Sequence, residues 1–137
     1  YFDAATKGTL RNFSKGKSPQ DSGSPSDDLA GASRIAPLVF CYPNDLEELV
    51  ETAKLQTRMT HRNPLTVRCA EFFARVAWKS LRGTPPTTAV AEVSEETFPE
   101  TIIAEWVEEG LESKSMDSVS AIASFGQACH TPGVFPG

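Results

Sequence analysis

The sequence predicts an all-α protein, because its apolar residues recur at helical spacing and no hairpin dipeptide separates alternating runs. The clearest helix follows Asn63-Pro64, a good capping residue and a proline suited to the first helical position. Its apolar stripe consists of Leu65, Cys69, Phe72, Phe73, Val76, Ala77 and Leu81. Gly83 and the following Pro85-Pro86 end this helix.

A second amphipathic helix is expected immediately upstream, opening near Asn44 and Asp45. Its apolar face comprises Leu46, Leu49, Val50, Ala53 and Thr57. The connection between the two helices is short, and we therefore expect them to be antiparallel neighbours. His61 lies in this connection, at the positive end of the second helix, which is a position that suits an anion.

The rest of the chain also fits a helical protein. Residues 1–13 are expected to close a helix, and residues 14–28, rich in Gly, Pro, Ser and Asp, to form a loop. The apolar run Ile35–Tyr42 is the one candidate for a buried strand. The remaining helices are expected at residues 88–93, 98–111 and 116–125. We interpret the glutamates of 98–111 as a solvated helix face rather than a catalytic cluster.

Composition narrows the class of protein. The 137 residues suit one compact domain, and 13 basic against 18 acidic residues give a net charge of −5, so neither nucleic acid nor a membrane is expected as a partner. The three cysteines are odd in number and lack C-x-x-C spacing, which predicts a reducing, cytoplasmic location. The chain begins at Tyr1 and stops within a turn, and we expect it to be an internal piece of a longer protein.

Several polar residues are candidates for chemistry. His61 and His130 have no partner at metal-ligand spacing, and we expect a structural role for both. Arg34 and Arg58 lie beside small or turn residues where an anion fits. The pair Asp27-Asp28 has the chemistry to bind a divalent cation, although adjacent loop carboxylates are commoner as helix caps. The residues alone therefore predict an anion site formed by residues 31–34 with His61.

Three segments resemble the ADP-ribosylglycohydrolase family. Gly31–Pro37 (GASRIAP) resembles the family's G-A-M-R-[IV]-A-P segment, and Gln56–His61 (QTRMTH) resembles its S-x-L-T-H segment, at a similar separation. Ala121–Gly137 resembles the family's A-x-x-F/S-x-P-x-A helix region, in the form carried by the J-type crystallins. The resemblance covers roughly Ser26 to Gly137, and the three motifs follow the family's order.

The resemblance implies an orthogonal all-α bundle, with residues 1–137 forming part of a single domain truncated at both ends. It implies a hydrolase that cleaves the glycosidic bond of ADP-ribosylated substrates over Mg²⁺ or Mn²⁺, with ADP-ribose or an ADP-ribosylated protein as partner. Carried over by position, it nominates as substrate-binding residues Ser26, Asp27, Asp28, Ala30, Gly31 and His61. It nominates no catalytic or metal-binding residue in this chain.

The sequence departs from the family pattern in two places. The family's aspartate motifs T-D-D-T and D-x-D-T-x-A are not found, so the metal ligands are expected outside this chain and the chain alone is expected to be inactive. The family's G-N-G appears as Asp28-Leu29-Ala30, which adds negative charge where phosphate is expected. Two alternatives follow: a non-enzymatic, crystallin-like structural protein, and an all-α interaction domain whose motif similarities are chance.

Overall fold

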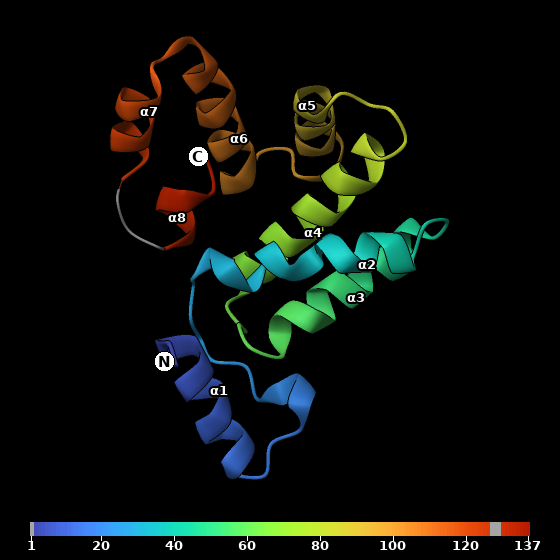
Figure 1. Ribbon diagram of the computed structural model, residues 1–137, viewed down its shortest axis with the longest axis vertical. Helices are drawn as coiled ribbons and strands as arrows, with labels where there is room; N and C mark the ends of the chain where they lie inside the picture. The colour runs from blue at the N-terminus through green and yellow to red at the C-terminus, as the bar shows by residue number, and fades with distance from the viewer. Residues whose placement is uncertain (1, 127–129) are drawn as a thin grey trace.

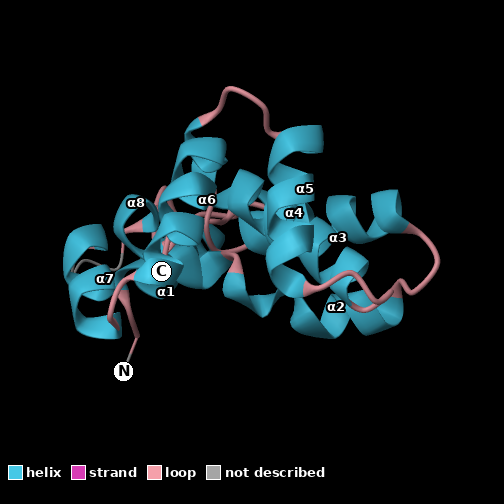
Figure 2. Cartoon of the chain, turned by 90° about the horizontal axis from the view of Figure 1, so that it is seen from above, coloured by secondary structure: helices cyan, strands magenta, loops and turns pink. Residues whose placement is uncertain are grey.

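The computed structural model describes residues 2–126 and 130–137, which form helices joined by loops (Figures 1 and 2). The α-helices are α1 (Ala4–Ser14), α2 (Ala36–Cys41), α3 (Leu46–Arg58), α4 (Pro64–Ser80), α5 (Pro86–Thr97), α6 (Ile102–Glu112), α7 (Ser118–Phe125) and α8 (Thr131–Val134). Short 3-10 turns are η1 (Pro19–Asp21), η2 (Leu29–Gly31), η3 (Ser33–Ile35) and η4 (Ser113–Ser115). The all-α prediction is confirmed. None of the described helices is long and apolar enough to cross a membrane.

Helices α3 and α4 form the expected antiparallel pair at the centre of the molecule (Figure 1). At the start of α3, the Asp45 carboxylate accepts a hydrogen bond from the backbone amide of Glu48 at 2.9 Å. At the start of α4, the side-chain oxygen of Asn63 accepts hydrogen bonds from the backbone amides of Leu65 and Thr66, at 2.9 and 3.3 Å. The core between them is built from Leu49, Val50, Ala53, Cys69, Ala70, Phe72 and Ala74. Both predicted helices and both predicted caps are therefore confirmed.

The cysteines occupy different environments. Cys69 is fully buried in this core, and burial raises the pKa of its thiol to about 12. Cys41 is exposed at the end of α2, and Cys129 lies outside the described residues. The placement of Cys69 in the apolar stripe of its helix is therefore confirmed.

The strand expected within Ile35–Tyr42 is wrong, because these residues form η3 and α2. Pro37 occupies the first turn of α2, where a fixed φ and a missing amide are tolerated. Ile35 and Val39 are buried one helical turn apart, whereas Phe40 is 74% exposed. A strand would also need a hydrogen-bonded partner, and the described chain offers this segment none.

The helices that follow α4 depart from their expected bounds. The helix expected at 88–93 is α5, which begins at Pro86 and ends at Thr97. The helix expected at 98–111 begins only at Ile102, because Phe98 caps α5 and Glu100 has a positive φ of 55°. Phe98 is buried and packs edge-on against Phe72, with ring centroids 5.7 Å apart. This pair of rings joins α5 to the core.

The end of the chain returns to the core through Phe135. Its ring lies 5.2 Å from the centroids of Phe72 and Phe73 and 5.4 Å from that of Trp106. Helix α7 forms as expected, with Asp117 as its cap, but Val119 and Ile122 on its apolar face are 78% and 63% exposed. Phe135, rather than α7, thus anchors this end of the chain by burial.

We expect Asn63→Ala to lower the free energy of unfolding by about 1 kcal/mol, because the amides of Leu65 and Thr66 lose their acceptor. Urea unfolding of the purified chain measures the change. Asn63→Asp keeps an acceptor at the same place and should be close to the parent. Equal stability of all three chains would contradict the assignment of Asn63 as a cap.

Candidate functional site

The connection between α3 and α4 is held by the loop that precedes α2. The Ser24 amide donates to the Thr60 carbonyl at 2.9 Å, and the Arg62 amide donates to the Ser24 carbonyl at 2.7 Å. These two bonds form a short parallel bridge between Ser24 and His61. They bring the loop alongside the connection that contains His61, although Ser24 and Thr60 are 36 positions apart in the sequence.

The side chain of His61 packs directly on Gly31. His61 is only 6% exposed, and a Cβ built on Gly31 would lie 2.5 Å from its Cγ, closer than any real contact. The buried Thr57 hydroxyl lies 2.9 Å from the Ala53 carbonyl and 3.3 Å from the Gly31 carbonyl, and its single proton is shared between these two acceptors. The predicted convergence of the small-residue segment with His61 is therefore confirmed, and glycine is required at position 31 by the close approach.

The imidazole of His61 is held in one protonation state. Its pKa is lowered, first by burial and then by the charge of Arg34. The Arg34 guanidinium donates to the Thr60 hydroxyl, which lies 2.9 Å from Nδ1 of His61. Because this hydroxyl accepts from Arg34, its own proton is free to donate to Nδ1, and we assign the ring proton to Nε2. Nε2 is buried and has no hydrogen-bond partner among the described residues.

The loop Ser26–Gly31 is folded on itself. The Ser26 hydroxyl accepts the Asp28 amide at 3.3 Å, and the Asp28 carboxylate accepts the Ala30 amide at 2.9 Å. The Gly31 amide donates to the Asp28 carbonyl at 3.3 Å. Ser26, Asp27 and Asp28 are half-buried and Ala30 is exposed. The backbone amides of Asp28, Ala30 and Gly31 are thus already paired within the loop.

Asp27 faces a different part of the chain. Its carboxylate lies 2.7 Å from Nδ1 of His130, and its carbonyl accepts the Thr131 amide at 2.9 Å. The hydrogen bond with His130 lowers the pKa of Asp27 and raises the pKa of His130. The sequence analysis expected only a structural role for His130 and did not connect it to the loop. Nothing in the local sequence signals a contact between residues 103 positions apart.

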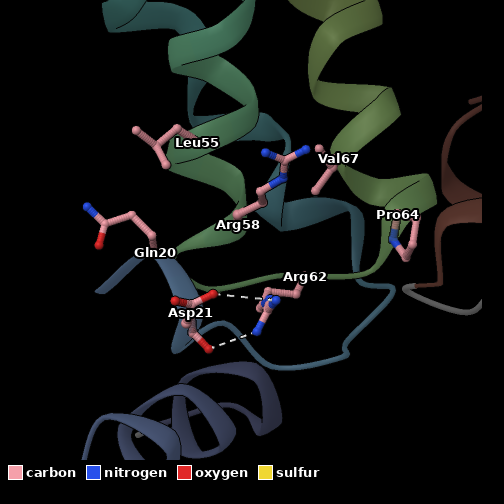
Figure 3. A pocket seen from close by; sticks show the side chains of 7 residues that line it. All are labelled: Gln20, Asp21, Leu55, Arg58, Arg62, Pro64 and Val67. Atoms are coloured by element: carbon pink, nitrogen blue, oxygen red, sulfur yellow. Dashed lines mark hydrogen bonds and ion pairs between the residues drawn. The ribbon is translucent and has the colours of Figure 1, made fainter. Parts of the chain in front are cut away.

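The candidate arginines lie on different sides of the connection. Arg34 contacts Thr60, whereas Arg58 lines a cavity of about 410 Å³ between η1, α3 and the start of α4 (Figure 3). In this cavity Arg62 donates to the Asp21 carbonyl at 3.0 Å, and Arg58 extends toward Val67 (Figure 3). The two arginines therefore do not join in one anion site.

A metal centre is not formed by the residues that the structure describes. Among them no group of three or more His, Cys, Asp or Glu side chains is placed to hold a metal ion. Asp27 is engaged by His130, and Asp28 caps η2. The predicted preference of this acidic pair for loop capping is borne out for Asp28. The donor set does not fit a dinuclear centre.

Comparison with known proteins gives one match. The model of the family described as ADP-ribosylglycohydrolase matches residues 2–131, which is nearly the whole chain. No curated protein and no solved structure matches it. The extent of the family match contradicts the interpretation that the three motif similarities are chance.

We expect Gly31→Ala to lower the free energy of unfolding by about 1–3 kcal/mol, because the added methyl group overlaps the imidazole of His61. Urea unfolding measures the effect. Gly137→Ala is the matched control, since the Cβ there meets its nearest atom at 3.6 Å and should leave stability unchanged. Equal stability of Gly31→Ala and the control would show that the loop does not press on His61.

The lowered pKa of His61 predicts a loss of stability in acid. Below the ordinary pKa of 6.5, His61 of the unfolded chain binds a proton, whereas His61 of the folded chain has a lower pKa and binds it less readily. The free energy of unfolding therefore decreases as the pH is lowered. We expect the stability advantage of the parent over His61→Asn to be larger at about pH 8 than at about pH 5. Urea unfolding at both pH values measures it, and an advantage that grows in acid would contradict the assignment.

Proposed function

This chain belongs to the ADP-ribosylglycohydrolase family, and on that premise we propose that the Ser26–Gly31 loop and His61 bind ADP-ribose in a hydrolase of ADP-ribosyl bonds. The family match supports a glycohydrolase function. ADP-ribosylated substrates are the partners that this function requires. We assign the chain to the binding of the substrate rather than to bond cleavage.

The observation that carries this proposal is the unpartnered Nε2 of His61. A buried donor without an acceptor costs roughly 1–3 kcal/mol, and few are left in folded proteins. A phosphate or ribose oxygen would satisfy it. The packing of His61 on Gly31 fixes the ring before the ligand arrives, so little is lost in ordering it.

The surroundings of His61 suit an anionic or hydroxyl-rich ligand. Arg34 adds a positive charge beside Thr60, and in the tautomer that we assign from the Thr60 contact, Nε2 is the donor of the neutral ring. Nε2 is buried in the free chain, so binding requires a local movement that opens it to the ligand. The residues thereby bind and orient the substrate and exclude water from the contact.

Bond cleavage requires groups that we assign elsewhere. Hydrolysis of a glycosidic bond passes through a transition state with oxocarbenium character, in which a water attacks as the leaving group departs. Asp27 and Asp28 are both engaged within the fold, and the described residues do not fit a metal centre. We propose that Mg²⁺ or Mn²⁺, where the reaction uses it, is held by residues outside this chain.

One observation favours a second function. The carboxylate of Asp28 accepts the Ala30 amide, so a negative charge already stands where a phosphate oxygen would bind. This arrangement weakens affinity for a diphosphate and favours a non-enzymatic, crystallin-like structural protein built on the same fold. Measured affinity for ADP-ribose separates the two.

We expect the chain to bind ADP-ribose weakly and His61→Asn to lower the affinity about tenfold or more, because the variant lacks the Nε2 donor. Isothermal titration calorimetry with ADP-ribose measures this, and EDTA should leave the result unchanged because the described residues hold no metal cluster. His130→Asn is the matched control and should bind as the parent does near pH 6. Absence of heat at millimolar ADP-ribose, or equal affinity of His61→Asn and parent, would contradict the proposal.

A further inference from the structure

His130 and Thr131 contact the candidate binding loop through Asp27 at three points. Nδ1 of His130 lies 2.7 Å from the Asp27 carboxylate, and the amide and hydroxyl of Thr131 both donate to the Asp27 carbonyl. Residues Asp28 and His130 also form an antiparallel bridge. We call His130, Thr131 and Asp27 the clasp.

The C-terminal side of the clasp is firmly anchored. Thr131 is fully buried, and its hydroxyl lies 3.3 Å from that of Thr66 in α4. Four residues later, Phe135 is buried against Phe72, Phe73 and Trp106. The clasp therefore ties the Asp27 end of the loop to a fixed point on the core, while Gly31 holds the other end on His61.

The polar contact in the clasp depends on protonation. The charged groups that act on His130 are Asp27 and Asp28, both on the loop, and α4 contributes only the uncharged hydroxyl of Thr66 beside Thr131. The hydrogen bond to Asp27 raises the pKa of His130, so its stabilisation is complete below the ordinary value of 6.5 and is lost as pH rises through the raised value. Asp27 has a lowered pKa and remains charged throughout this range.

The two side chains are exposed enough to exchange protons freely. His130 is 68% and Asp27 is 42% accessible, in contrast to the buried His61. An exposed ion pair adds little to global stability. Its effect is local, because one partner lies in the loop that packs on His61 through Gly31.

We propose that His130 is a positioning residue for the Ser26–Gly31 loop, and that loss of its proton loosens the clasp and lowers the affinity of the loop and His61 for ADP-ribose. The effect on affinity rests on the function proposed above, whereas the effect on the loop does not. His130 acts through Asp27 and the loop and does not touch the ligand.

Amide hydrogen exchange of residues 26–31 tests the effect on the loop directly. After correction for intrinsic exchange rates, we expect protection of this loop in the parent to fall several-fold between about pH 6 and pH 8, across the range where histidine loses its proton. His130→Asn carries an amide donor near the position of Nδ1 that does not titrate, and its loop protection should be independent of pH. His130→Ala should show low protection at both pH values.

Asp27→Asn is the second test. It keeps His130 and removes the carboxylate charge that raises the pKa of His130. It should also lose the pH dependence. Loop protection that is equal in the parent and His130→Ala, or a pH dependence that persists in His130→Asn and Asp27→Asn, would overturn the inference.

Calorimetry with ADP-ribose over the same pH range separates this inference from the proposed function. Affinity that falls with pH in the parent and stays constant in His130→Asn supports both. A pH-dependent loop without ADP-ribose binding would refute the function and leave the clasp standing. Binding of ADP-ribose with a loop that does not respond to pH would refute the clasp alone.

Discussion

The contact between Gly31 and His61 is the constraint on which the rest of the candidate site depends. Backbone and imidazole approach so closely that no side chain fits at position 31. The contact requires the short connection between α3 and α4 to stand beside the loop, and the bridge between Ser24 and His61 secures that arrangement. The imidazole is buried at this contact, which lowers its pKa, and its Nε2 has no partner among the described residues. The contact with Gly31 thereby fixes the position of the ring.

The two histidines of the chain illustrate how burial divides roles. His61 is buried, and burial lowers its pKa and favours the neutral ring. His130 is exposed beside a carboxylate, which favours its charged form, and it therefore responds to pH near neutrality. Both contact the same six-residue loop, His61 through Gly31 and His130 through Asp27. The Ser26–Gly31 loop is thus held at Gly31 by packing and at Asp27 by a hydrogen bond whose strength depends on the protonation of His130.

Much of this architecture follows from local sequence signals, and the part that does not is long-range. The caps Asp45 and Asn63 and the apolar stripes of α3 and α4 act within one or two turns, so the sequence predicted that pair. The strand expected within Ile35–Tyr42 was wrong because a short apolar run carries no information about whether a hydrogen-bonding partner exists. The small residues beside His61 were found through spacing and resemblance. The contact between Asp27 and His130 was not predicted, because it depends on how the C-terminal part of the chain packs against the core.

The central claim is that His61 presents a sealed Nε2–H donor to an ADP-ribose oxygen. A proton–nitrogen correlation spectrum of the imidazoles, recorded without and with ADP-ribose, examines that donor itself. We expect His61 to carry its proton on Nε2 in the free chain, and we expect this resonance to shift when ADP-ribose is added. A proton on Nδ1, or a shift confined to other parts of the chain, would contradict it.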